Sequence, residues 1–462
     1  MGMSKAFRSY QPEQRLLLPP SLEEWLPEGH LARLVSDVVE ELDLREIYAG
    51  YEDDGRGLAA YHPLLMVKVL FYGYGVGKAS SRKLEQATYE DVAVRYLATN
   101  QHPDHDTLAT LRRRHWGARA RLFGQVLPLC QKPGLVKRRH GAIDGTKRRA
   151  NASRYRGLTY ARRQEEQRQL EEEITRWLKH AAAVDRAEDE EYGKGCRGDE
   201  WPPELQTRAQ RLARIRELKA ELESAARAAA EKKKAEVEQR LAERRAEEER
   251  GGRRFGGRVP GVPDVQQAKP QPQAQRNLSD PESRIMKDGA TNRFQQGYNA
   301  QVAVEGTRQV IVAARVTPAE HDREQLVPNL EAVERHVGRK PEQVSADCGY
   351  DDPDHLQSAY WNDVRLYRPP VPEPRAGPQA RRWARNGPLL DRLREQMHQA
   401  EAQAIYQLPQ GIVEPVFGQI KQWRGFRQFL VRGLRAVQAE WEIICTTHNL
   451  LKLYRYGGAR ST

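Results

Sequence analysis

The sequence predicts an α/β protein built on a mixed sheet, with a long helical insertion after the first strand and an all-helical domain before it. Three observations support this fold class. Helical patterning fills about the first 130 residues, a strand-like stretch follows at KRRHGAIDGT, and dense mixed charge with helical spacing then separates this strand from the later ones. The chain of 462 residues is long enough for several domains.

The charge balance narrows the function classes. Lys and Arg number 76 against 64 Asp and Glu, for a net charge of +12. Residues 112–157 hold 14 Lys and Arg and one acid, Asp144. A block this one-sided favours binding to a phosphate backbone over a basic surface that only keeps the protein soluble. Double-stranded DNA is therefore the expected partner.

Other partners and compartments are not indicated. The sequence has no run of about 18 apolar residues, so no membrane partner is expected. No G-x-x-x-x-G-K motif is present, so no nucleotide triphosphate is implied. The four cysteines form no C-x-x-C pair and the first residues lack a signal-peptide pattern, which together indicate a reducing cytoplasm.

Residues 1–135 are predicted to form an all-helical DNA-binding domain. Pro63 suits the first turn of a helix, and Asp104 or Asp106 is a candidate N-cap for a later one that runs into three arginines. Short helices with basic ends are typical of helix-turn-helix DNA readers, but ordinary helical bundles share the pattern. Both interpretations remain open at this point.

Residues 158–250 are predicted to form a helical insertion. Leu170, Ile174 and Leu178 recur at helical spacing within dense mixed charge. An antiparallel helical hairpin is the simplest structure, and a dimeric coiled coil is the alternative. The Gly-, Pro- and Gln-rich residues 251–279 have no periodicity and are predicted to be a flexible linker.

The catalytic domain is assigned to residues 136–157 and 280–462. GYNAQVAVEG and RQVIVAARVT predict a β-hairpin over residues 297–317, a helix is expected over residues 321–337, and EQVSADCGY predicts a strand that ends on Asp347. The order strand, insertion, hairpin, helix, strand, helix is that of a ribonuclease H-like mixed sheet.

Three acids stand out in this order. Asp144 is predicted to close the first strand at a Gly-containing turn, Asp347 to close the fourth, and Glu414 to lie at the edge of a helix that begins at Pro415. Singly, each has an ordinary explanation as a turn former or a helix-dipole partner. Together in a basic surround they would repel one another unless a divalent cation neutralised them. Two Mg²⁺ or Mn²⁺ ions about 4 Å apart would support phosphodiester hydrolysis and transesterification on DNA.

The blocks AIDGT, SADCGY and VEPVFGQIKQWRGFRQFLVRG resemble bacterial insertion-sequence transposases of the DDE type, and most closely the insertion sequence eleven-eighty-two family. Glu414 followed by six residues and then Lys421 is similar to the most specific signature of that family. The resemblance implies that Asp144, Asp347 and Glu414 are catalytic metal ligands for two Mg²⁺ ions, with Mn²⁺ as the alternative, and that Lys421 is a catalytic residue near the cut phosphate.

The resemblance also implies partners and a location. The DNA would be the terminal inverted repeats of the element and a target duplex, bound by a homodimer, in the nucleoid of a bacterial cytoplasm. The basic residues on both sides of the acids are the expected DNA contacts. These residues are Arg112, Arg113, Arg114, Lys137, Arg138, Arg139, Lys147, Arg148, Arg424, Arg427 and Arg432.

One position departs from the family pattern. The family has a Tyr seven residues and an Arg four residues before the Glu, where this sequence has Gln407 and Gln410, with Tyr406 displaced by one. A neutral amide cannot replace a bidentate guanidinium on phosphate. The expected function is a cut-and-paste transposase. One alternative is a transposase-derived DNA-binding protein that these two changes impair catalytically, and another is a ribonuclease H-like nuclease that shares the acidic site but carries out no strand transfer.

Overall fold

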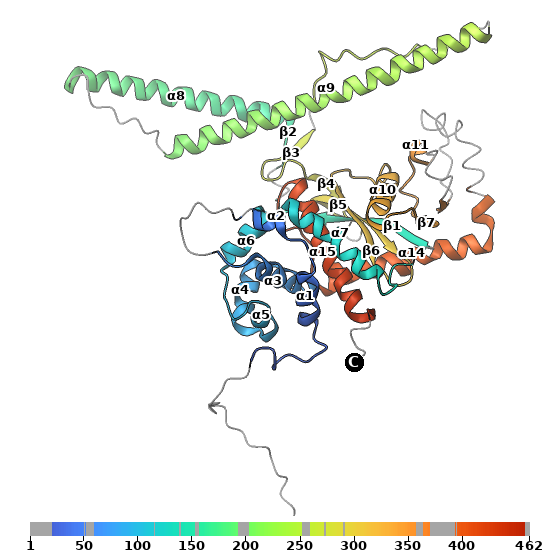
Figure 1. Ribbon diagram of the computed structural model, residues 1–462. Coiled ribbons are helices and arrows are strands. Elements are labelled where there is room, and N and C mark those ends of the chain that lie inside the picture. The colour runs from blue at the N-terminus through green and yellow to red at the C-terminus, as the bar shows by residue number, and fades with distance from the viewer. Residues whose placement is uncertain are drawn as a thin grey trace, which may run out of the picture.

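The computed structural model has a helical region, a mixed sheet with helices on both faces, and a long helical arm (Figure 1). None of its described helices combines the length and the hydropathy that a membrane span needs. The structure describes residues 21–49, 51, 60–114, 116–137, 140–152, 157–192, 203–251, 259–271, 274–289, 292–356, 364–369, 393 and 395–457.

The helical region is built from short helices, as predicted. Pro63 is the first residue of α3, where its missing N–H leaves no helical hydrogen bond unmade. Asp104, not Asp106, caps α6, because its Oδ1 accepts hydrogen bonds from the backbone N of Asp106 (2.9 Å) and of Thr107 (2.8 Å). The described helices of this region are α1 (Leu31–Glu40), α2 (Arg45–Ala49), α3 (Pro63–Gly75), α4 (Ser81–Glu90), α5 (Val92–Leu97), α6 (His105–Arg114) and α7 (Trp116–Gln131).

The sheet is mixed, which confirms the predicted α/β class. Antiparallel pairs join β5 to β1 on one side and to β4 and β6 on the other, while β1, β7 and β8 run parallel in that order. The predicted hairpin corresponds to β5 and β6. The strands are β1 (His140–Arg149), β4 (Arg284–Lys287), β5 (Phe294–Glu305), β6 (Ile311–Thr317), β7 (Gln343–Ala346) and β8 (Arg365–Tyr367).

The predicted end of the first strand at Asp144 is wrong. An Asp–Gly pair is a turn former in isolation. Here β1 continues straight through both residues to Arg149, because Gly145 pairs with Gln301 of β5 inside an antiparallel ladder that runs the length of the strand. Asp144 therefore lies in the middle of a long strand, not at its end.

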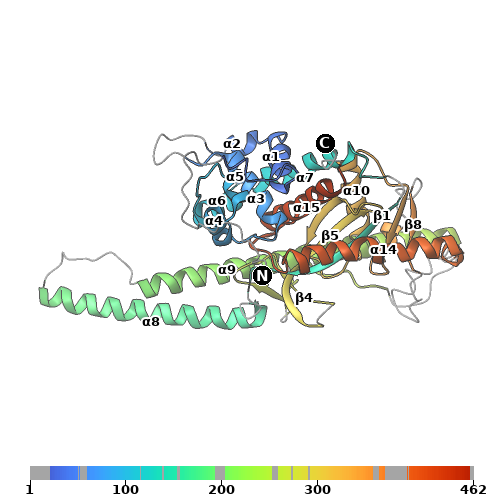
Figure 2. The ribbon, with the colours of Figure 1, turned by 90° about the horizontal axis from the view of Figure 1, so that it is seen from below.

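Helices cover both faces of the sheet. Side chains alternate along a strand, and on β1 Thr146 meets Lys421 while Gly145, one residue earlier, faces Asp322. One face thus carries α14 (Ala400–Gly418), the π-helical turn η3 (Gln419–Trp423) and α15 (Leu434–Tyr456). The opposite face carries the segment before α10 (Leu326–Val337). Figure 2 shows α14 crossing the strands.

The helix that carries Glu414 differs from the prediction. It was expected to begin at Pro415, since proline is favoured in a first helical turn, but α14 begins at Ala400 and continues through Pro409 and Pro415. Proline inside a helix costs about 3 kcal/mol. Burial of one helix face against the sheet offsets this cost. The buried apolar residues are Ile412, Val413, Val416 and Phe417.

The arm consists of α8 (Tyr160–Tyr192) and α9 (Pro203–Gly251), which stand away from the rest of the molecule (Figure 1). They pack against each other as the predicted hairpin, with ion pairs such as Arg211–Glu166 (2.5 Å). At the base of the arm, β2 (Gly157–Thr159) pairs with β3 (Gln275–Asn277). The strand β3 lies inside residues 251–279, so this part of the predicted linker is ordered by pairing with β2.

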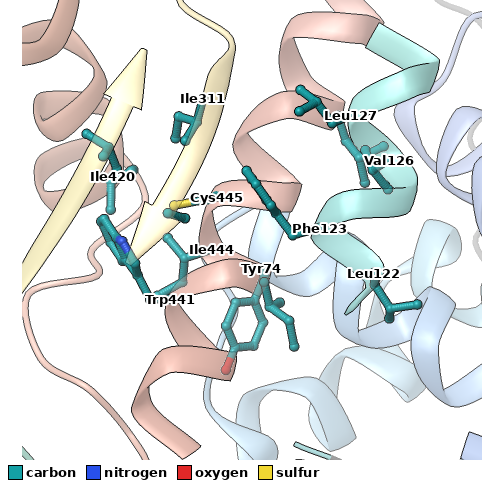
Figure 3. Packing of buried hydrophobic residues seen from close by; sticks show 14 of the residues in the cluster. Tyr74, Leu122, Phe123, Val126, Leu127, Ile311, Ile420, Trp441, Ile444 and Cys445 are labelled. Carbon is teal, nitrogen blue, oxygen red and sulfur yellow. The ribbon is translucent and has the colours of Figure 1, made fainter. Parts of the chain in front are cut away.

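The helical region and the sheet share one hydrophobic core. In Figure 3, side chains of α7 face α15, and α15 in turn covers β6. Because α15 is buried against both regions, its apolar surface fixes how the helical region sits on the sheet. The labelled side chains are Tyr74, Leu122, Phe123, Val126, Leu127, Ile311, Ile420, Trp441, Ile444 and Cys445.

Candidate active site

Two of the three predicted acids lie side by side. The parallel pairing of β1 and β7 ends with Ile143 opposite Ala346. The next residues are Asp144 and Asp347, so their carboxylates leave adjacent strands at the same level of the sheet. Asp347 comes directly after the end of β7, and its Oδ1 accepts a hydrogen bond from the backbone N of Gly349 (2.8 Å).

Excess negative charge surrounds Asp144. Burial raises the pKa of this carboxyl group to about 7, and the charges of Asp347, Asp322 and Glu414 act in the same direction. Burial also raises the pKa of Asp347, and the negative charge of Asp322 adds to this shift. The positive charges of Arg368 and Lys147 oppose it. Asp347 is nevertheless exposed, so a ligand in solvent can reach its carboxylate.

Lys421 reaches the same face of β1. Its Nζ donates a hydrogen bond to Oγ1 of Thr146, two residues after Asp144. Burial and the charge of Arg148 lower the pKa of Lys421, whereas Asp288 and Asp144 favour its charged form. A π-helical turn starts after Gly418, so the spacing from Glu414 to Lys421 is not two regular α-helical turns.

Glu414 is exposed on α14, which packs on β1 and β7. Within the described residues, no three His, Cys, Asp or Glu side chains are grouped closely enough to hold a metal ion. The structure thus places Asp144 beside Asp347, with Glu414 near enough to affect the pKa of Asp144, but it does not draw the three carboxylates into one closed cluster.

The donor set fits a divalent cation. Carboxylate oxygens are the ligands that Mg²⁺ and Mn²⁺ prefer. A carboxyl group whose pKa is raised by burial and by neighbouring acids, as at Asp144, is in the electrostatic state that a bound cation relieves. The chemistry of these residues is therefore suited to metal-assisted reactions at phosphate.

The predicted DNA contacts divide by burial. Arg112, Arg148 and Arg424 are only 5%, 1% and 3% exposed, so they offer no surface to a phosphate group. Arg148 packs against aromatic rings instead, 4.7 Å from the ring centre of Phe429. Lys147 is half-buried and paired with Asp322. The predicted contacts that are exposed, and so can reach a phosphate group, are Arg113, Arg114, Lys137, Arg427 and Arg432.

Several predicted positions cannot be placed. Arg138 and Arg139 lie outside the described residues. Tyr406, Gln407 and Gln410 belong to the helix α14, but their side chains are outside the described part of the structure. The effect of the two glutamines therefore stays a prediction.

Sequence reasoning missed Asp322. The helix expected over residues 321–337 would have included this residue, but α10 begins only at Leu326. A usable signal was present in β5, where Asn299 and Gln301 interrupt an apolar strand at alternate positions. Two buried polar side chains on one strand face require a polar partner, and Asp322 is that partner.

Comparison with family models gives two matches. Residues 20–114 match the family described as Transposase domain (DUF772), and residues 264–450 match the Transposase DDE domain. The second match includes Asp347, Glu414 and Lys421 and starts after β1, so Asp144 lies outside it. Neither curated proteins nor solved structures give a match. The chain therefore carries a transposase domain in its helical region and a transposase DDE domain that contains each described strand of the large sheet except β1.

Proposed function

We propose that the protein is a cut-and-paste DNA transposase whose catalytic site is formed by Asp144, Asp347, Glu414 and Lys421. The observation that carries this proposal is the adjacency of Asp144 and Asp347 at the end of the parallel β1–β7 pair, on the face that Lys421 reaches. The two transposase domains support the same function class.

The three carboxylates would hold two Mg²⁺ ions, or Mn²⁺ as the alternative. When bound, such ions activate water and stabilise the attacking and leaving oxygens of an in-line displacement at a phosphodiester. Burial of Asp144 favours this role, because a desolvated carboxylate beside other acids gains most from a cation. Glu414 would close the ligand set from α14 once the ions and the DNA are present.

Lys421 would position the scissile phosphate. Its hydrogen bond to Thr146 holds the ammonium group on the face of β1 that carries Asp144. A compact cation there attracts a phosphate oxygen and opposes the negative charge that develops during displacement. The half-buried side chain keeps this charge close to the carboxylates.

DNA would be held by exposed basic residues in both regions. Arg113 and Arg114 end α6 in the helical region, and Arg427 and Arg432 follow η3 beside the catalytic residues. The terminal inverted repeats would contact both sets of residues. The protein would bind them as a homodimer, and the α8–α9 arm would contribute to the contact between protomers. We also propose that the fold is ribonuclease H-like, which the strand order β6-β5-β1-β7-β8 supports. We further propose that the protein is a member of the insertion sequence eleven-eighty-two family and that it acts at the nucleoid in a bacterial cytoplasm.

The test uses the full chain and DNA that carries the ends of the encoding element. With Mg²⁺ or Mn²⁺ we expect nicking at the ends and joining of the freed 3′-hydroxyl groups to a second duplex. Asp144→Asn, Asp347→Asn and Glu414→Gln should each abolish both steps with DNA binding retained, whereas Glu331→Gln, an exposed acid on α10, should not.

Three outcomes would contradict the proposal in different ways. Cutting that persists in all three variants would exclude this site. Metal-dependent cutting without joining would indicate a nuclease. Binding of the ends with no cutting by the unaltered protein would indicate a DNA-binding protein derived from a transposase.

A further inference from the structure

The segment between β6 and α10 binds the sheet from the face opposite the proposed catalytic residues. Oδ1 of Asp322 accepts hydrogen bonds from Nε2 of Gln301 (2.5 Å) and from Nδ2 of Asn299 (2.7 Å). Nζ of Lys147 lies 3.2 Å from both carboxylate oxygens. Three donors from two neighbouring strands thus converge on one carboxylate, which is only 21% exposed.

Gly145 is the reason that this carboxylate can approach the sheet. The antiparallel register places Gly145 opposite Gln301 and Lys147 opposite Asn299. A methyl group on Gly145 would lie 2.1 Å from Nε2 of Gln301 and 2.5 Å from Oδ1 of Asp322. The glycine directly after Asp144 therefore leaves the space that the Asp322 network fills, and any larger residue would displace it.

The same segment also binds the chain that follows Asp347. Nε of Arg323 lies 3.3 Å from Oδ1 of Asp351. Gln301 extends the connection through a second path, because its Oε1 accepts a hydrogen bond of 2.5 Å from the hydroxyl group of Tyr350, which is fully buried. The adjacent residues Asp322 and Arg323 are thus tied to the two parts of the chain that carry the paired aspartates.

We propose that Asp322 and Arg323 form a clamp that fixes the separation of the Asp144 and Asp347 carboxylates, and that both are positioning residues of the proposed catalytic site. The proposal rests on the proposed function, since the separation matters for cation binding. Asp322 itself is not suited to be a metal ligand, because its oxygens already accept three side-chain donors and it faces the other side of β1.

The geometry makes the direction of the effect clear. Without the Asp322 carboxylate, Lys147 loses its ion-pair partner and the amides of Asn299 and Gln301 lose an acceptor. Buried groups left without partners rearrange to find new ones. The two strand ends would then move relative to each other, and displacements of about 1 Å are enough to weaken a constellation that must hold a cation.

The test measures Mn²⁺ binding to the full-length chain by titration calorimetry, beside DNA affinity, end cleavage and urea unfolding. Asp322→Ala and Gly145→Ala break the network from its two sides, and each should weaken Mn²⁺ binding at least tenfold. The double variant should be no worse than the stronger single one, because both changes disrupt the same contacts. DNA affinity should stay within twofold of the unaltered protein.

The matched control is Gly141→Ala on the same strand. Its added methyl group would meet the backbone O of Val304 at 3.6 Å, an ordinary contact, so Mn²⁺ binding should be unchanged. If Asp322→Ala does not fold, Asp322→Asn keeps the shape and most hydrogen bonds, and should show a smaller loss of Mn²⁺ affinity at an unchanged urea midpoint.

The outcomes separate the clamp from the proposed function. If the unaltered protein binds no Mn²⁺, the clamp is overturned whether or not the protein cuts DNA, and if it also cuts no DNA the proposed function fails as well. If it binds and cuts, but Asp322→Ala and Gly145→Ala bind Mn²⁺ like the unaltered protein, the clamp alone is overturned. A loss of Mn²⁺ affinity matched by an equal loss in Gly141→Ala would also overturn it.

Discussion

The hydroxyl group of Tyr74 donates a hydrogen bond of 3.3 Å to Oε1 of Glu440, joining α3 of the helical region to α15 on the sheet. Glu440 is 1% exposed, and its Oε2 accepts the backbone N–H of Leu430 (2.9 Å). Burial raises the pKa of Glu440, although the hydrogen bonds from the backbone N–H groups of Leu430 and Val431 and the charge of Arg148 favour its ionised form. One buried carboxyl group therefore connects both regions of the molecule.

Replacing Tyr74 by Phe should remove that connection without changing the packing. A net loss of about 1 kcal/mol in the free energy of unfolding is expected for one hydrogen bond. Urea unfolding checks this value. Tyr89→Phe is the matched control because Tyr89 is 58% exposed, and it should unfold like the unaltered protein. Equal stability of both variants would show that the hydrogen bond contributes nothing.

A glycine at the same junction gives a second prediction. Gly77 has a φ of +81°, and an added methyl group would lie 2.9 Å from the backbone O of Arg424. Gly77→Ala should destabilise the protein by more than 2 kcal/mol, roughly the sum of about 1 kcal/mol for the left-handed backbone and the cost of overpacking. Gly134→Ala, at φ +73° with open space around it, isolates the backbone part. Similar losses in the two variants would contradict the close contact.

The raised pKa of Glu442 should make the free energy of unfolding depend on pH. Burial raises the pKa of this carboxyl group from 4.5 to about 8, partly opposed by a hydrogen bond from Gln438. The unfolded chain releases the proton near pH 4.5 and the folded chain near pH 8. Between these values the folded state binds more protons, so the free energy of unfolding falls as the pH rises.

Glu442→Gln should remove this dependence. At pH 8.5 the variant should be more stable than the unaltered protein by on the order of 2 kcal/mol, and near pH 5 the two should agree. Urea unfolding at both pH values measures the difference. Glu334→Gln, an exposed residue of α10, is the control. A constant difference at both pH values would rule out titration of Glu442 as the cause.

Two neighbouring arginines test the assignment of the DNA surface. Arg113 is exposed at the end of α6, whereas Arg112 is buried and donates a hydrogen bond to the backbone O of Ala79. Arg113→Ala should weaken DNA binding and lower the slope of log affinity against log salt by about 1, with unchanged stability. Arg112→Ala should instead destabilise the fold by about 2 kcal/mol and leave the slope unchanged. A lower salt slope in Arg112→Ala, with a loss of stability in Arg113→Ala, would contradict this assignment of the two residues.

The sequence was sufficient to predict the α/β class and the hairpin, because hydrophobic periodicity determines these features locally. It also singled out Asp144 and Asp347, although their adjacency depends on the pairing of two strands far apart in the chain. It was not sufficient for Asp322, whose partner Lys147 is far away in the chain. It also could not separate Arg113 from Arg148, since charge counts do not report which face of a strand or helix is buried. The predicted start of α14 was wrong because proline is favoured in the first turn of a helix but can also lie inside a helix with a buried face, as Pro415 does.

The arm leaves and re-enters the fold through β2 and β3, which are hydrogen-bonded partners. Paired strands lie about 4.8 Å apart, so the ends of this long excursion meet almost as closely as those of a tight turn. For the sheet, the arm is therefore an appendage on a β-ribbon. Its length can change during evolution, or be cut down to a short loop in the laboratory, without altering the path of any strand that carries a proposed catalytic residue.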